Sequence, residues 1–482
     1  MNTPLRRLAT TALVMFVALM VGATWVQVGQ AAALNDDPRN VRTLYRAFGS
    51  ARGPIVVGGT AVASSVPVDD PFNYQRQYTD GDLYSAVTGF FSIANGTSGL
   101  ERAENDVLTG RGDSLFFSRV RDLLTGRRPE GAAIETTIVP AAQKAARDGL
   151  GDQRGAVVAI EPSTGKILAL VSTPGFDPNA LASHDTAAAG AAYAALEAAD
   201  GNPLSSRATR ERYAPGSTFK LVTAAAALAA GRTPDTLLAS PRELALPGTS
   251  ATIQNFGGSS CGADQVSLAD ALRVSCNTAF AQLGMDLGAD AIDAQARAFG
   301  FGDPSLTVPQ PVVSSVFPAG LDQPQTAQAA IGQFDVQATP VQMAMVAAGI
   351  ANGGVVMRPY LVQTVRAADL SVVSEAKPQA YSTAMTPANA AALRDMMVGV
   401  VQGGTGTAAR ISGVTVAGKT GTAQTVPGEA PHAWFTAFAP AEAPRVAVAV
   451  LVEHGGSLGN DATGGRVAAP IARAVIQAVL GQ

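Results

Sequence analysis

The chain has 482 residues, of which 47% are hydrophobic and 15% charged, and its formal net charge is −4. One hydrophobic core stops growing at about 250 to 300 residues, so this length predicts two or three domains. The nearly neutral charge, without a cluster of Lys and Arg or a run of acids, argues against a nucleic-acid-binding protein and against a disordered acidic arm.

The N-terminal segment has the composition of a membrane anchor. Residues 8–34 carry no charge, and the largely apolar run at 9–28 has about the length that crosses a bilayer as a helix. Arg6 and Arg7 precede this run, so the positive-inside rule keeps the short N-terminus in the cytoplasm. A cleaved signal peptide is the rival interpretation, because three alanines at 31–33 could form a cleavage site, but the length of the run favours an uncleaved anchor.

These observations predict a protein of the cell membrane that crosses it once. We expect a cytoplasmic tail at 1–8 and a transmembrane signal-anchor helix at 9–30, with all later residues outside the cytoplasm. Short apolar runs mixed with turn signals predict a smaller, extended, β-rich N-terminal module at 35–150. The sequence pattern changes near residue 155, where a strand-like apolar run begins, so we expect the main domain at 151–482.

The main domain opens with a predicted hairpin and ends with further strands, while its middle is helical. Strands are predicted at 155–160, 166–171, 414–417, 433–439 and 446–452. Helices are predicted at 217–230, 268–274, 340–351, 387–401 and 465–479. This order of elements argues for an α+β domain.

The first motif that carries chemistry is Ser217-Thr-Phe-Lys220, which follows a Pro-Gly pair at a predicted helix entry. Residues at i and i+3 share one helix face, so we expect the hydroxyl and the amine within hydrogen-bonding reach. A neutral lysine can remove the proton of a serine, and a helix N-terminus offers N–H groups to an oxyanion. Ser163-Thr-Gly-Lys166 has the same spacing, but it falls in the predicted hairpin turn, where no helix aligns the two groups.

Two further motifs follow in the chain. Ser275-Cys-Asn277 comes directly after a predicted helix, where a loop could project both polar side chains into a cleft. Lys419-Thr-Gly-Thr422 continues an apolar run, so it should lie on a strand, with Gly421 allowing close approach by a ligand. Each motif alone has an ordinary structural interpretation, as a helix cap and turn or as an edge-strand lysine with a bulge glycine.

In this order, the three motifs resemble those of the penicillin-recognising serine enzymes. The segment Tyr213-Ala-Pro-Gly-Ser-Thr-Phe-Lys220 is similar to the nucleophile segment of transpeptidases, and Arg52-Gly-Pro-Ile55 is similar to the opening of a class B N-terminal module. Tyr84-Ser-Ala-Val-Thr-Gly89 and Gly99-Leu-Glu101 resemble the actinobacterial and mycobacterial penicillin-binding protein A group. The resemblance covers residues 50–480.

The resemblance implies a serine β-lactamase-like transpeptidase domain, with an antiparallel sheet flanked by helices, after a non-catalytic dimerisation or pedestal module. It implies a D,D-transpeptidase of cell-wall synthesis, with roles in division or cell shape, that β-lactams acylate. Ser217, Lys220, Ser275 and Lys419 would be catalytic. Four residues would bind substrate, namely Asn277, Thr420, Gly421 and Thr422.

Lysine is rare in this chain, which gives weight to the two lysines in the motifs. Lys220 must be neutral to act as a base, so its pKa must fall well below its usual value, and desolvation and the positive charge of Lys419 would both lower it. Thr420 and Thr422 would hold the terminal carboxylate of the D-Ala-D-Ala substrate. The N–H groups of Ser217 and Thr422 would, by resemblance, form the oxyanion hole.

Cys261 and Cys276 lie fifteen residues apart, and either a disulfide or two buried thiols fits this pattern. They lack the paired spacing of a zinc site, and the three histidines are scattered, so we expect no metal. The proposed chemistry needs no organic cofactor.

Several alternatives use the same residues. A D,D-carboxypeptidase would use water as the acceptor, and a non-catalytic cell-wall scaffold would leave the motifs idle. A β-lactamase is disfavoured because about 180 residues separate the apolar run from Ser217, and a β-lactam sensor is disfavoured because few residues precede this run. By analogy with class B proteins, we expect a membrane glycan polymerase as partner.

Overall fold

The computed structural model describes residues 2–30, 34, 48–112, 115, 130–424 and 428–482. The chain divides into two compact units, one formed by Met1–Ala51 with Ser65–Gln75 and the other by Arg52–Ser64 with Arg76–Gln482. The alternative cleavage site at 31–33 lies outside the described residues.

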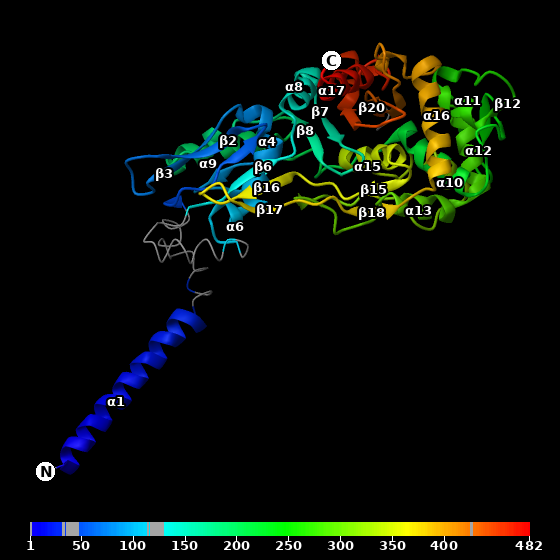
Figure 1. Cartoon of the computed structure of the whole chain (residues 1–482). Coiled ribbons are helices and arrows are strands. Elements are labelled where there is room, and N and C mark those ends of the chain that lie inside the picture. The colour runs from blue at the N-terminus through cyan, green and yellow to red at the C-terminus, as the bar shows by residue number, and fades with distance from the viewer. Residues whose placement is uncertain (1, 31–33, 35–47, 113–114, 116–129, 425–427) are drawn as a thin grey trace. The chain divides into compact units, whose positions relative to one another are not determined.

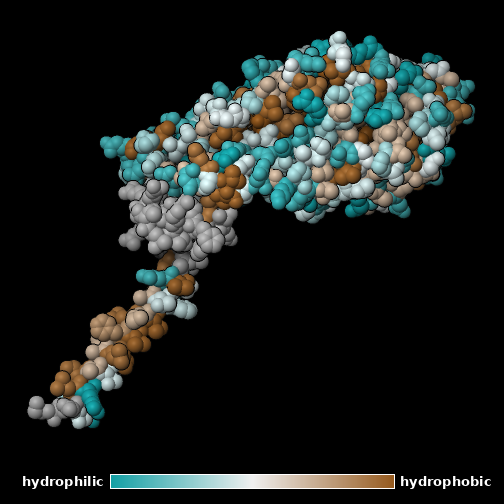
Figure 2. Space-filling view, viewed as in Figure 1, coloured by the Kyte–Doolittle hydropathy of each residue, from teal (hydrophilic) through white to brown (hydrophobic). Residues whose placement is uncertain are grey.

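The first unit contains a long apolar helix, α1 (Asn2–Thr24), which continues into a π-helical turn at Trp25–Gly29 (Figure 1). Its mean hydropathy is 1.9 over the most apolar window, and none of that window is buried. In Figure 2 hydrophobic side chains cover most of its surface. The hydroxyls of Thr10 and Thr11 donate to backbone carbonyls one turn earlier, so both polar groups have a partner within the helix. The helix has the length and composition of a membrane anchor.

A six-stranded sheet has the strand order β17-β16-β6-β1-β2-β3. Strands β1 and β6 pair in parallel, and β6 pairs antiparallel with β16, which lies more than 200 residues later in the chain. The strands are β1 (Ile55–Val57), β2 (Thr60–Pro67), β3 (Tyr74–Tyr78), β6 (Ala133–Thr136), β16 (Val362–Arg366) and β17 (Val372–Glu375). Beside them are α4 (Gly81–Thr88), β4 (Phe91–Ser92), β5 (Gly96–Thr97), α5 (Gly99–Ala103) and α6 (Asn105–Leu108).

Four buried polar residues of this region form an N-terminal ionic cluster: Arg52, Arg76, Tyr78 and Glu101. The carboxylate of Glu101 accepts hydrogen bonds from Arg52 Nε at 2.9 Å, Arg76 Nε at 2.6 Å and the Tyr78 hydroxyl at 3.2 Å. Each of the four residues is at most 6% exposed. The two guanidinium groups therefore share one carboxylate in a site that water does not reach.

The main sheet of the second unit is antiparallel, in the order β19-β20-β21-β7-β8. Helices α8 and α17 cover one face and α15 covers the other (Figure 1). Because both faces are covered, every residue of β7, β8, β20 and β21 is buried, and these strands are continuous apolar runs rather than alternating ones. The elements are β7 (Gly155–Ile160), β8 (Ile167–Thr173), β19 (Ala417–Ala423), β20 (His432–Ala439), β21 (Val446–Val452), α8 (Pro140–Leu150), α15 (Pro340–Ala351) and α17 (Ala468–Leu480).

Of the remaining helices, α9 (Thr186–Ala198) packs against Phe90, Phe176 and Leu181, and the others pack against one another, with α16 (Pro387–Gly403) in contact with α15. Polar side chains mark where some helices begin. The hydroxyls of Thr339 and Thr386 accept from backbone N–H groups three residues later, and each is followed by a proline at the first helical position. The helices are α9 (Thr186–Ala198), α10 (Lys220–Ala229), α11 (Leu268–Arg273), α12 (Asn277–Leu287), α13 (Ala289–Ala298), α14 (Gln323–Ala329) and α16 (Pro387–Gly403). Short strand pairs complete the unit: β9 (Leu237–Ala239) with β12 (Gln265–Ser267), β10 (Glu243–Ala245) with β11 (Thr252–Gln254), β13 (Thr307–Val308) with β14 (Gln310–Pro311), and β15 (Val355–Met357) with β18 (Ala380–Thr383).

The predicted hairpin at 155–171 and the five predicted helices of the main domain are present, with ends that differ by a few residues. The predicted strand at 414–417 is wrong for its first three residues. An isolated bridge between Ile411 and Val414 closes a turn around Gly413, so the strand β19 starts only at Ala417.

Candidate active site

Ser217 lies in a 3₁₀ turn, Gly216–Phe219, that leads directly into α10. Three neighbouring elements hold this turn. The Gly216 N–H donates to the Gly332 carbonyl at 2.9 Å, and Trp434 Nε1 donates to the Ala214 carbonyl at 3.0 Å. Gly216 has φ of 51°, and a Cβ there would lie 2.8 Å from the Thr422 carbonyl oxygen. Only glycine fits this position, because the turn presses against strand β19.

Lys220 is completely buried at the start of α10. Its Nζ donates to the Ser275 carbonyl at 2.7 Å and to Asn277 Oδ1 at 2.8 Å, and it lies 3.4 Å from Ser275 Oγ. Burial, and then the positive charge of Lys419, hold the pKa of Lys220 well below its usual value.

Lys419 is also completely buried, on strand β19. Its Nζ donates to Ser275 Oγ at 2.7 Å and to the Thr420 carbonyl at 2.9 Å. Burial lowers the pKa of Lys419 to about 7. Neither Lys220 nor Lys419 is paired with a carboxylate of the described residues. The Ser275 hydroxyl lies between the two amines, and its own proton is left for a third partner.

Contacts with the segment that follows β11 hold the Ser275 loop in place. Ser275 has φ of 61°, a left-handed conformation uncommon for a residue with a side chain. Asn277 is the first residue of α12, and Asn255 Oδ1 accepts from its N–H at 2.8 Å. Cys261 and Cys276 form a disulfide, which joins the loop after β11 to the Ser275 loop. The two-thiol interpretation is therefore wrong in this structure.

Thr420 and Thr422 lie on the groove side of β19. The hydroxyls of Thr405 and Thr420 form a hydrogen bond of 2.6 Å, and Thr422 is half-buried. Approach of a ligand to Gly421 stays a prediction, but the chain itself also uses the close space that this glycine leaves. A Cβ at this position would lie 2.9 Å from Thr218 Cγ2 and 2.9 Å from Trp434 Cβ, so the side-chain space is taken by the chain itself.

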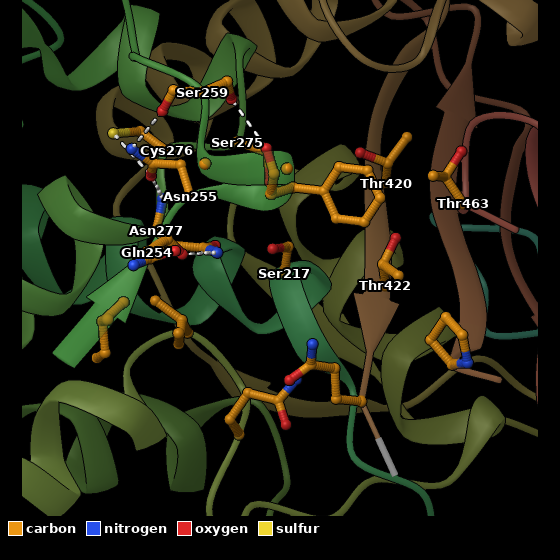
Figure 3. A pocket seen from close by; sticks show the side chains of 18 of the residues that line it. Ser217, Gln254, Asn255, Ser259, Ser275, Cys276, Asn277, Thr420, Thr422 and Thr463 are labelled. Atoms are coloured by element: carbon orange, nitrogen blue, oxygen red, sulfur yellow. Dashed lines mark hydrogen bonds between the residues drawn. The ribbon is translucent and has the colours of Figure 1, made fainter. Parts of the chain in front are cut away.

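These residues meet at a groove with a volume of about 1370 Å³. Ser217, Ser275, Asn277, Thr420 and Thr422 line it, while Lys220 and Lys419 are buried behind its wall. Figure 3 shows Ser217 between the Ser275–Asn277 segment on one side and the two threonines of β19 on the other. The structure thus brings all eight predicted catalytic and substrate-binding residues together.

One predicted contact is absent. The spacing predicted that Ser217 and Lys220 lie within hydrogen-bonding reach, but among the described residues Ser217 Oγ makes no hydrogen bond, and Lys220 Nζ donates to Ser275 and Asn277. The amine takes a backbone carbonyl and an amide oxygen as partners, because a buried donor without partners is unfavourable. Catalytic hydrogen bonds are often long in ligand-free structures and shorten only when substrate binds.

A buried network beside the Ser217 turn was not predicted. The Tyr213 hydroxyl donates to Glu453 Oε1 at 2.7 Å, and Arg207 Nε donates to the same oxygen at 2.6 Å. Burial and the charge of Glu453 raise the pKa of Tyr213 far above its usual value. Nothing in the sequence around Glu453 marks it as a partner of Tyr213, because 240 residues separate them.

Comparison with known proteins matches two parts of the chain to protein families. Residues 155–477 match the penicillin binding protein transpeptidase domain, and residues 52–134 match the penicillin binding protein A dimerisation domain. The chain is 48% identical to the peptidoglycan D,D-transpeptidase PbpA of Mycolicibacterium smegmatis, over 100% of this chain and 99% of that protein.

Two solved structures of penicillin-binding protein A from M. tuberculosis are also similar. The ceftriaxone acyl-enzyme complex has a TM-score of 0.87 and 45% identity, covering 90% of this chain and 100% of that one. The penicillin G acyl-enzyme complex has a TM-score of 0.85 and 46% identity, covering 89% of this chain and 100% of that one. With its convergent serine and lysine motifs, the chain belongs to the penicillin-binding protein transpeptidase family.

Proposed function

We propose that Ser217 is the nucleophile of this peptidoglycan D,D-transpeptidase. Its hydroxyl attacks the carbonyl of the penultimate D-alanine of a stem peptide, the terminal D-alanine leaves, and an acyl-enzyme forms. An amine of a neighbouring stem peptide then takes the acyl group. β-lactams form the acyl-enzyme in place of the peptide.

Lys220 is the proposed base. A lysine removes a proton only in its neutral form, and burial next to Lys419 favours that form by lowering the pKa of Lys220. Ser275 is proposed to pass a proton toward the leaving amine, because its hydroxyl already accepts from Lys419 and lies near Lys220 Nζ. The uncompensated pair of buried amines around one hydroxyl is the observation that carries this assignment.

The substrate would be held on both sides of Ser217. Asn277 is proposed to bind the peptide backbone, and Thr420 and Thr422 to bind the terminal carboxylate in the positive field of Lys419. The N–H groups of Ser217 and Thr422 are the proposed oxyanion hole. The 2.8 Å between a Cβ at Gly216 and the Thr422 carbonyl supports this, because it places the two backbone segments side by side. Gly421 contributes by letting the Ser217 turn approach β19.

The test is labelling with fluorescent penicillin, followed by mass spectrometry of the labelled peptide. Wild type should carry one adduct on Ser217, and Ser217→Ala should carry none. Ser163→Ala is the matched control, because Ser163 has the same spacing to a lysine but lies in the turn between β7 and β8; it should label like wild type. An adduct on another residue, or full labelling of Ser217→Ala, refutes the assignment.

We further propose that α1 holds the chain in the cell membrane, with residues 1–8 in the cytoplasm and the active site outside it. Support comes from Arg6 and Arg7 at the start of the apolar helix. The proposed division is a non-catalytic module at 35–150 and a transpeptidase domain at 151–482. A membrane glycan polymerase is the proposed partner, by analogy with class B proteins.

A further inference from the structure

The groove contains a charged side chain that none of the steps above uses. This inference rests on Ser217 being the nucleophile, and it concerns the amine that takes the acyl group. The attacking amine must occupy the place that the leaving D-alanine amine vacates, because both bond to the same carbon along the same path. The carboxylate of the leaving D-alanine would lie at Thr420 and Thr422, so the acceptor has to enter at that end of the groove.

The lining of the groove beyond Thr422 is almost entirely neutral. Along the chain from β19 the next lining residues are Gln424, Gly428 and Glu429, and the same groove is lined by Asn460 and Thr463. Among all described residues that line the groove, Glu429 is the only one with a charged side chain.

Glu429 is available to a ligand. Its side chain is 50% exposed, and its one ionic contact with a described residue is long, with 3.5 Å between Oε2 and His454 Nδ1. A carboxylate offers two oxygens and about four lone-pair positions, so this contact leaves most of its capacity for another donor. Peptide amines are largely protonated in neutral water, and an acidic group at the entrance attracts them.

We propose that Glu429 is an acceptor-binding residue, whose carboxylate receives the ammonium group of the incoming stem peptide at the Thr422 end of the groove. The ammonium then gives one proton to solvent. The neutral nitrogen forms the new amide bond to the acyl carbon, the ester bond to Ser217 Oγ breaks, and the second proton passes from the nitrogen to Ser217 through Lys220.

The experiment measures the ratio in which the acyl-enzyme gives cross-linked product and hydrolysed donor. Full-length protein in detergent receives a stem-peptide donor ending in D-Ala-D-Ala and an amine-bearing stem peptide at increasing concentration, and cross-linked product and hydrolysed donor are quantified. This ratio reports only on the acyl-enzyme and not on the rate at which it forms. Glu429→Gln should lower the ratio about two- to fivefold, as expected for a partly exposed ion pair. Glu429→Asp should retain most of it.

Two controls sharpen the result. Glu442 is exposed and does not line the groove, so Glu442→Gln should match wild type. Added salt should lower the ratio in wild type but leave Glu429→Gln nearly unchanged, because salt screens the proposed attraction. A Glu429→Gln protein with the wild-type ratio and the wild-type salt response overturns the proposal. Failure of penicillin to label Ser217 would instead overturn the proposed function, so the two failures are distinguishable.

Discussion

The N-terminal ionic cluster and the active site each bury two basic side chains, yet among the described residues only those of the cluster have a carboxylate beside them. Arg52 and Arg76 share Glu101, whereas Lys220 and Lys419 have a serine hydroxyl, an amide oxygen and backbone carbonyls as partners. Arginine stays charged in such a place, while lysine can lose its proton. Paired arginines make a site that holds the fold, and unpaired lysines make a site where a proton can move.

The largest effect that would test this difference between buried arginines and buried lysines comes from placing an arginine in the active site. Lys220→Arg keeps a cation but removes the ability to become neutral, so acylation by penicillin should fall about 10³- to 10⁴-fold. Stopped-flow fluorescence or gel labelling with fluorescent penicillin measures the rate constant. Circular dichroism confirms that the variant is folded, and Lys419→Arg, which keeps the charge that its site uses, should lose much less. An acylation rate of Lys220→Arg within tenfold of wild type would contradict the role of Lys220.

The converse change removes the shared acid from the N-terminal ionic cluster. Glu101→Gln leaves two buried guanidinium groups without a carboxylate, and the free energy of unfolding should fall by about 3 to 5 kcal/mol. Thermal and denaturant unfolding measure the loss. Glu135→Gln is the matched control: Glu135 pairs with Arg366 in the same sheet, but both side chains are 34% exposed, so its loss should stay below about 1 kcal/mol. Equal losses in the two variants would show that burial of the pair is not what matters.

The pH dependence of the acylation rate tests the role of the two lysines through a smaller expected effect. Lys220 acts only when neutral, so the rate should rise with pH as this lysine passes its lowered pKa. Lys419 attracts a carboxylate only when charged, so the rate should fall again, by up to about tenfold per pH unit, above its pKa of about 7. Rate constants from pH 5 to 10 test this, and Lys419→Arg should move the falling side to higher pH. If the acylation rate of Lys419→Arg decreases at the same pH as that of wild type, Lys419 is not the cause of the decrease.

The same shift bears on stability, with the same sign of pH dependence as for a paired acid but at higher pH. Lys419 in the unfolded chain stays protonated up to about 10.5, and in the folded chain only up to about 7. Between these values the unfolded state binds more protons, so the contribution of Lys419 to the free energy of unfolding rises with pH.

The fold class and the convergence of the motifs could be predicted because short signals carry them. The Pro-Gly pair before Ser217 marks a helix entry, and the apolar run before Lys419 marks a strand. The side-chain geometry could not be predicted. Whether Lys220 points to Ser217 or to Ser275 depends on carbonyl and amide acceptors that come from a segment more than fifty residues away.

Pairings between distant segments also could not be predicted from the sequence. Strands β16 and β17 are short, and nothing in their sequences indicates that they join β6 rather than the main sheet. The Glu453–Tyr213 contact is hidden for the same reason. The sequence predicted close approach of a ligand at Gly421, but only the folded chain reveals that Thr218 and Trp434 lie against this glycine.

The pairing of β6 with β16 has a consequence for how this protein is made. Until β16 pairs with it, β6 is an open edge of the N-terminal sheet, ready to pair with another chain. On the ribosome, that edge stays uncovered until the chain has been synthesised through residue 366, after most of the helices have emerged. The N-terminal sheet is therefore completed late, and a fragment that ends shortly after β6 would be prone to aggregate.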